Sequence, residues 1–334
     1  MIEHNKQLSN FINQSQSTIE NSTNSQELVD IIEKSRIFNG NFKYNHKDIL
    51  IYISIAVLCW IISILLLITH NHDFWLATLL ISTFAIAAIT KAFFKRGKNI
   101  NELADAIFWK DLYFDNHITD SKDAHYSITA LKERFNDFHR GNYSQSIPTL
   151  VKGHYESQNK AYDYYYFNFH YVDERIVEST DSDGKKTEEK VYDHYDRYGI
   201  ILPYTIAENV RIIENNKLFG QNKSDYEPAS LSFRKLFLVK TNDTFQASKL
   251  LSPSMVEYLE ALPNNYNNIV LELKANELLL SFTNKDTLAS KREYNFNQLD
   301  KFLAEIRDVK KLPRLTHLHS VCDFFIQNTQ NNFD

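Results

Sequence analysis

Two long apolar runs near the N-terminus constrain the fold of this chain more than any other feature. The first, residues 49–69, contains no charge, and the second extends from Trp75 to about Phe94. At 1.5 Å per residue the first run spans about 31 Å, roughly the hydrocarbon core of a bilayer. Because backbone polar groups need internal partners in lipid, the runs predict a transmembrane helical hairpin. A cleaved signal peptide fits less well, since 48 mostly polar residues precede the first run.

Basic residues beside the two runs predict the orientation of the hairpin. Lys and Arg flank both outer ends, whereas residues 70–74 between the runs contain neither and include Asp73. The positive-inside rule therefore places both termini in the cytoplasm and predicts a multi-pass membrane protein. The flanking basic residues are Lys34, Arg36, Lys43, Lys47, Lys91, Lys95, Arg96 and Lys98.

Charge and cysteine content limit the partners. Residues 99–334 carry 28 Lys and Arg against 35 Asp and Glu, a formal charge of −7. A nucleic-acid partner is therefore not expected, because it requires a dense basic face. Cys59 lies in the first apolar run and Cys322 near the C-terminus, so we predict two buried free thiols that never meet.

The hydrophobic period changes from helical to strand-like along the rest of the chain. Residues 1–24 predict a polar tail that is weakly helical or disordered, and after it Ser25 is a candidate cap for a short helix. Helices are also predicted at Ile100–Tyr113, Tyr126–Phe138, Thr244–Lys249, from Ser252, at Asn297–Lys311 and at Leu315–Ile326. Strands are predicted at Ile147–Tyr155, Tyr162–Val177, Glu188–Tyr204, Leu231–Lys240, Ile269–Leu273 and Glu277–Phe282, with a turn at Asp183-Gly184 and a further short strand or connector at Ala207–Glu214.

These segments predict an α+β protein with a mainly antiparallel sheet. Its expected divisions are a polar tail (1–48), the transmembrane hairpin (49–94, with helices 49–69 and 74–94), a helical stalk (95–146) and a cytosolic α+β domain (147–334).

One stretch carries a resemblance to a known family. Residues 231–239 (LSFRKLFLV) are followed by Asp243, then by 247–253 (ASKLLSP) and 255–259 (MVEYL). A Phe-containing strand, a short turn and an Ala-x-x-Leu-Leu-x-Pro helix start resemble a family of uncharacterised bacterial membrane proteins, classified as a domain of unknown function. Phe219-Gly220 loosely matches a further feature of that family. The resemblance implies two transmembrane helices, a cytosolic α+β domain and a place in the bacterial inner membrane, but it brings no functional residue.

Candidate chemistry is sparse. The densest polar cluster is Asp193-His194-Tyr195-Asp196, in which alternation places His194 and Asp196 on one face of a strand. Such a pair serves as a general base or half of a metal site, although a solvated strand face explains it more simply. On one helix, the imidazoles of His317-x-His319 point too far apart to chelate a metal. His70-x-His72 could bind a metal or sense pH, although two polar aromatics at a headgroup interface need no such role. The tyrosines at 162, 164, 165, 166 and 171 could form a stacking or peptide-binding face, but cross-strand pairs explain them more simply. We therefore assign no catalytic, cofactor-binding or metal-binding residue.

The function that these observations favour is a membrane-anchored, non-catalytic binding or scaffold module. Its expected partners are the lipid bilayer, through residues 49–94, and a protein, with homo-oligomers allowed. The alternative is a membrane-tethered, hydrolase-like enzyme whose site forms only on folding. It predicts a pocket that collects several of His154, His170, Asp193, His194 and Asp196. An effector in a host membrane is compatible with the composition, and transport fits least, since the apolar runs hold no carboxylate.

Overall fold

The computed structural model describes residues 2–39, 41–68, 75–157, 160–180, 186–215, 223–283 and 286–328. These residues form two compact units. Unit 1 consists of residues 1–115 and 291–310, and unit 2 of residues 116–290 and 311–334. Each unit is described by itself, since each has its own core.

Unit 1 is helical. Its elements are α1 (Ile2–Asn21), α2 (Ser25–Lys34), the 3₁₀ helix η1 (Ser35–Phe38), α3 (Lys47–Ile68), α4 (Trp75–Asp115), the 3₁₀ helix η5 (Phe296–Gln298) and α9 (Leu299–Arg307). Apolar side chains spaced three and four residues apart bury Leu8 and Ile12 on α1, Leu28 and Ile32 on α2, Leu103 and Ile107 on α4, and Phe302 and Ile306 on α9. The tail predicted to be weakly helical is therefore a packed helix. The cap of α2 is Asn24, whose side chain accepts a hydrogen bond from the Glu27 amide, and not Ser25.

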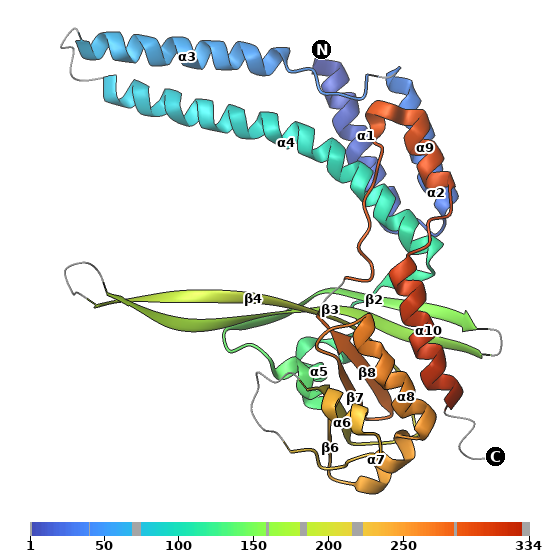
Figure 1. Ribbon diagram of the computed structural model, residues 1–334. Helices are drawn as coiled ribbons and strands as arrows, with labels where there is room; N and C mark the ends of the chain where they lie inside the picture. The colour runs from blue at the N-terminus through green and yellow to red at the C-terminus, as the bar shows by residue number, and fades with distance from the viewer. Residues whose placement is uncertain are drawn as a thin grey trace. The chain divides into compact units, whose positions relative to one another are not determined.

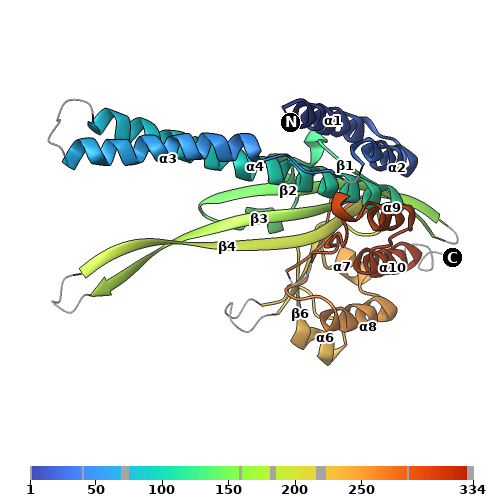
Figure 2. The ribbon, with the colours of Figure 1, turned by 90° about the horizontal axis from the view of Figure 1, so that it is seen from above.

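The apolar runs form the antiparallel helices α3 and α4, which lie side by side (Figures 1 and 2). Among the described residues, however, no helix combines the length and hydropathy that a membrane crossing requires. This finding contradicts the predicted transmembrane hairpin, and with it the multi-pass placement in an inner membrane with cytoplasmic termini.

Unit 2 is built on one eight-stranded antiparallel sheet, in the order β1-β2-β3-β4-β8-β7-β5-β6. The α+β class and the antiparallel sheet predicted from the sequence are confirmed. The strands are β1 (Ile118–Asp120), β2 (Ser144–Ser157), β3 (Lys160–Thr180), β4 (Lys186–Pro203), β5 (Val210–Glu214), β6 (Phe237–Thr241), β7 (Val270–Lys274) and β8 (Glu277–Phe282). β3 and β4 are the longest of these strands and continue past the others as a two-stranded ribbon (Figures 1 and 2).

Alternation along β3 separates the two faces of the sheet. Phe167, Phe169 and Tyr171 on one face join a buried cluster with Phe135 and Phe138. Short helices surround the sheet: η2 (Ala124–Tyr126), α5 (Ile128–Arg134), η3 (Asn136–His139), α6 (Leu231–Leu236), α7 (Thr244–Leu250), α8 (Pro253–Ala261), η4 (Leu262–Asn264) and α10 (Pro313–Asn328). The other face carries Tyr164, which contacts α10 through His319 at a ring-centroid distance of 5.0 Å.

Two sequence predictions about unit 2 were wrong. The strand predicted over Leu231–Lys240 begins as helix α6, because the Ser230 hydroxyl accepts a hydrogen bond from the Phe233 amide and caps a helical turn. The single helix predicted over Tyr126–Phe138 is divided into η2, α5 and η3, with extended backbone at Ser127 and Phe135. The predicted turn at Asp183-Gly184, His70-x-His72 and Phe219-Gly220 lie outside the described residues.

Candidate functional site

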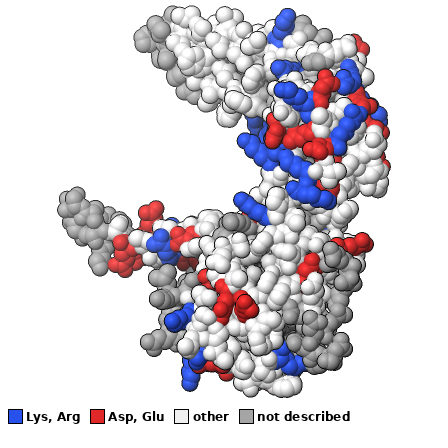
Figure 3. Space-filling view, turned by 45° about the vertical axis from the view of Figure 1, so that its right-hand side comes forward, with Lys and Arg blue, Asp and Glu red and all other residues white. Residues whose placement is uncertain are grey.

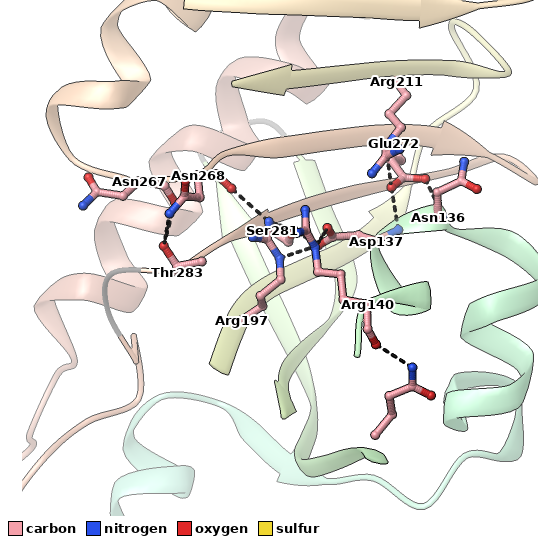
Figure 4. A network of polar contacts seen from close by, with 11 residues as sticks. Asn136, Asp137, Arg140, Arg197, Arg211, Asn267, Asn268, Glu272, Ser281 and Thr283 are labelled. Atoms are coloured by element: carbon pink, nitrogen blue, oxygen red, sulfur yellow. Dashed lines mark hydrogen bonds and ion pairs between the residues drawn. The ribbon is translucent and has the colours of Figure 1, made fainter. Parts of the chain in front are cut away.

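A buried ionic network lies at the centre of unit 2 (Figure 4). The Arg197 Nε donates to Asp137 Oδ2 at 2.6 Å, and the side chains are 1% and 2% exposed. The Arg197 guanidinium also donates to the Ser281 hydroxyl at 2.6 Å and to the Asn268 carbonyl at 2.9 Å. Ser281 donates to the same Asp137 oxygen, while Arg140 donates to the other at 2.7 Å. The side chains of Arg197, Asp137, Ser281 and Arg140 are therefore held in one geometry.

A second carboxylate closes the network. Glu272 on β7 accepts hydrogen bonds from the backbone amides of Asn136 and Asp137 at 2.7 and 2.8 Å, and it pairs with Arg211 on β5 at 3.1 Å. The network thus ties the η3 segment to strands β4, β5, β7 and β8. It links segments that are up to 144 residues apart in the sequence.

The surroundings of the two buried carboxylates, Asp137 and Glu272, shift their pKa values in opposite directions. Burial alone would raise the pKa of Asp137, but Arg197 and Arg140 outweigh burial and lower it to about 2. Burial raises the pKa of Glu272, against the opposing effect of Arg211. Because Asp137 stays ionised and each of its oxygens is occupied, it is a structural anchor and a poor proton acceptor at neutral pH.

A pocket of about 680 Å³ opens beside this network. Its walls come from β4, from the ends of β5 and β7, from β6, and from Thr283 directly after β8. Arg140, Arg197 and Lys240 supply cations, Asp196 and Glu214 supply carboxylates, and Tyr171, Tyr195, Tyr198, Ile213, Leu238 and Ile269 supply aromatic and apolar surface. This mixture suits a side chain or a small amphipathic ligand better than a single ion.

The structure brings together three of the five residues that the enzyme alternative singled out. His170 Nδ1 lies 3.0 Å from Asp196 Oδ1, and His170 Nε2 lies 3.2 Å from His194 Nδ1. His194 and Asp196 share one strand face, as their alternation predicts, and both line the pocket. The two imidazoles therefore satisfy each other and the carboxylate. Within the described part of the chain, no set of three or more His, Cys, Asp or Glu residues is arranged to hold a metal.

The other two residues lie elsewhere. Asp193 Oδ2 accepts from Arg175 Nε at 2.6 Å on the ribbon, and His154 Nδ1 lies 2.7 Å from Asp163 Oδ1. His154 lines a different pocket of about 480 Å³, together with Lys311 and His319. The enzyme alternative predicted a pocket that collects several of these groups; of the five, His194 and Asp196 line the 680 Å³ pocket, while His154 lines the other one.

His319 is the most unusual group of this second pocket. Burial, with a smaller contribution from Lys311, lowers its pKa to about 4, so the imidazole is neutral at pH 7. Its Nε2 is buried without a hydrogen-bond partner, as is the hydroxyl of the neighbouring Tyr164. His317, two residues away, instead contacts the Tyr266 hydroxyl through Nδ1 at 2.8 Å. The two imidazoles therefore have different surroundings.

The α3 and α4 hairpin of unit 1 presents a broad apolar surface. Its side chains lack charge over most of the hairpin (Figure 3). We define this hairpin surface by residues that are 40–74% exposed: Leu50, Ile51, Tyr52, Ile55, Val57, Leu58, Trp60, Ile61, Ile62, Leu65, Leu80, Ile81 and Phe84. Cys59 is exposed on α3, in contrast to the predicted buried thiol, whereas Cys322 is buried. A surface of this kind on a folded protein indicates an interaction site.

Comparison with known proteins assigns no family. No family model matches the chain, and no curated protein matches it. A solved structure similar to it is the crystal structure of the mycobacterial trehalose monomycolate transport factor A, at 15% sequence identity and a TM-score of 0.29. The alignment covers 60% of this chain and 90% of that chain. Such a score supports no conclusion about fold or function, and the family resemblance seen in the sequence stays a prediction.

Proposed function

We propose that the protein is a non-catalytic binding or scaffold module that holds a protein partner through the hairpin surface. The observation that carries this proposal is the exposure of consecutive large apolar side chains on α3, where Leu50, Ile51 and Tyr52 are 58–59% exposed. Single exposed apolar residues are ordinary, but a continuous apolar surface is costly to keep in water. Burying each such side chain contributes about 1.5–3 kcal/mol, so a partner gains affinity by covering several of them.

The polar groups of unit 2 support the non-catalytic part of the proposal. Asp137 is ionised and fully hydrogen-bonded, and the imidazole of His170 is hydrogen-bonded to both His194 and Asp196. A general base has to accept a proton near neutral pH, and the low pKa of Asp137 makes it unsuited to that role.

A photo-crosslinking experiment on the full chain tests the proposal. A benzophenone amino acid replaces Phe84, which is 74% exposed on α4, and adducts formed in cells are identified by mass spectrometry. We expect one reproducible protein adduct. The adduct should disappear in an Leu58→Glu/Ile81→Glu variant, and persist in Ile37→Glu, which alters an apolar residue that is 70% exposed but lies outside the hairpin.

The adduct also identifies the kind of partner. An adduct of the chain with itself makes a second copy the partner, and a heterologous adduct identifies another protein. The proposal is wrong if no protein is captured at position 84, or if purified protein instead sediments with phosphatidylcholine vesicles through the same side chains.

A further inference from the structure

The long β3–β4 ribbon leaves an edge of β4 without a partner strand. β4 pairs with β3 from Lys186 to Ile201, but it pairs with β8 only from Tyr198 to Pro203. Among the described residues, no other strand pairs with β4, so its edge is open from 188 to 197. At about 3.3 Å per residue this open edge is roughly 30 Å long. In an antiparallel strand, alternate residues direct their N–H and C=O groups to such an edge.

The corresponding edge of β3 is capped directly beyond its last pair with β2, at Val172 and Glu174. The Asn142 side chain accepts from the Glu174 amide at 2.7 Å and donates to the Glu174 carbonyl at 3.0 Å, and the Tyr143 amide donates to the Val172 carbonyl at 3.0 Å. Side-chain capping of this kind blunts an edge against further strands. In the described part of unit 2, the open edge of β4 has no similar cap.

The 680 Å³ pocket lies at the inner end of this open edge. Residues 194–198 of β4 form one of its walls, and Thr283, directly after β8, forms another. An added strand would therefore continue the line of β8 along β4, and the first of its side chains would enter the pocket among Tyr195, Tyr198 and Ile269.

The negative charge of the ribbon favours basic residues in such an added strand. Over residues 173–179 and 188–196 the ribbon carries seven carboxylates and two cations, and acidic side chains are prominent on it (Figure 3). Two like-charged pairs lie directly opposite each other, Asp173 with Asp193 and Glu178 with Glu188. Such cross-strand pairs are destabilising, and a nearby cation relieves them. The cations Arg175 and Lys190 are bonded to Asp193 and Glu174, so the ribbon keeps an excess of negative charge.

We propose that the open edge of β4 binds an extended, Lys- or Arg-rich segment of a partner protein by strand addition. Main-chain hydrogen bonds to β4 supply the register, the carboxylates of the ribbon attract the basic side chains, and the pocket receives one side chain at the inner end. This site belongs to unit 2 and does not depend on the hairpin surface of unit 1.

A peptide-binding assay tests the site. The probe is the labelled, capped heptapeptide Lys-Val-Lys-Val-Lys-Val-Lys, titrated with the full chain and followed by fluorescence anisotropy. Its matched control carries N-methyl groups on alternate residues, which keep the charge but remove the hydrogen-bond donors of one edge. We expect saturable binding by the probe, at least 10-fold weaker binding by the methylated peptide, and slower hydrogen exchange of the β4 amides when the probe is bound.

Two protein variants distinguish the effect of the ribbon carboxylates on binding from the effect of the protein's overall charge. Glu188→Lys/Glu189→Lys should weaken binding of the probe at least 10-fold, because it reverses two exposed charges beside the open edge. Glu257→Lys, at an exposed position on α8, should leave it unchanged. Equal binding of the two peptides would mean electrostatic adhesion without strand addition and would overturn the proposal. So would undetectable binding of the probe, or an equal loss of binding in the Glu257→Lys variant.

Discussion

The Nε of Arg197 lies 2.6 Å from Oδ2 of Asp137, and neither side chain is more than 2% exposed. Both charges would lose a large hydration energy on folding, and in the folded chain each recovers it from several fixed partners. The Asp137 carboxylate is held by Arg197, Arg140 and Ser281. The contact therefore depends on the complete network, and removing one member leaves another charge buried without compensation.

The first prediction concerns this contact. Asp137→Asn should lower the free energy of unfolding of unit 2 by about 3–5 kcal/mol, because it leaves the Arg197 charge buried and uncompensated. Urea denaturation followed by hydrogen exchange of β7 amides measures this loss. The double variant Asp137→Leu/Arg197→Met removes both charges and should lose less than the single variant. A double variant that is less stable than Asp137→Asn would contradict the argument.

The second prediction concerns a glycine in the sheet. A Cβ on Gly153 of β2 would lie 2.1 Å from Cζ of Tyr164, its partner on β3. Tyr164 is 1% exposed and fills the space above the glycine, so its ring cannot move to solvent. Gly153→Ala should therefore lower the free energy of unfolding by about 1–3 kcal/mol or more, measured by thermal denaturation. If the overlap with the ring is the cause, Gly153→Ala should cost much less in a Tyr164→Leu background than in the wild-type chain.

Local patterns were sufficient to predict most of the sheet. Alternation along 162–177 and 188–204 predicted β3 and β4. The β7–β8 hairpin was predicted because two apolar strands flank the short turn at 274–276. The same reasoning failed at Leu231–Lys240, where six apolar residues indicate a strand but a serine cap starts a helical turn. A cap acts through one side-chain hydrogen bond, and the spacing of apolar residues gives no information about that bond.

The candidate sites could be predicted only in part. His194 and Asp196 were identified because they are neighbours in sequence, but His170, which contacts both, comes from another strand. Asp137, Arg197 and Ser281 meet only because η3, β4 and β8 converge, and each is an ordinary polar residue in its own segment. The open edge of β4 could not be predicted from the sequence either, because it depends on which strand pairs with β4 and on how much shorter that strand is.

The third prediction concerns the pH dependence of unit 1. Burial raises the pKa of Asp111 to about 7, with Asp115 and Glu305 adding to the effect of burial and a hydrogen bond from Ser25 opposing it. A folded-state pKa above the unfolded value of about 3.9 means that the folded state keeps the proton longer. The stabilisation is complete below pH 4 and is lost as the pH rises to about 7, a change of up to about 4 kcal/mol.

Tryptophan fluorescence isolates this effect, because all three tryptophans, Trp60, Trp75 and Trp109, belong to unit 1. Urea unfolding monitored in this way should show lower stability at pH 8 than at pH 5. Asp111→Asn should remove most of the difference, and Asp105→Asn, whose carboxylate is about half exposed, should not. If the free energy of unfolding changes equally with pH in the wild-type chain and in Asp111→Asn, the pH dependence does not come from Asp111.

The fourth prediction has the opposite sign and concerns unit 2. Burial lowers the pKa of His319 to about 4, whereas an unfolded histidine titrates near 6.5. Between these values the unfolded chain binds a proton that the folded chain does not. The stability of unit 2 is therefore complete above pH 6.5 and falls as the pH decreases toward 4, by up to about 3 kcal/mol.

His317→Gln serves as the matched control, because this histidine is two residues away on the same helix. Hydrogen exchange of β7 amides at pH 5 and 7 should show the loss in the wild-type chain and in His317→Gln, and a much smaller loss in His319→Gln. A histidine ring resonance of residue 319 that titrates near 6.5 in the folded protein would show that the pocket is open to water, and the predicted pH dependence would then be wrong.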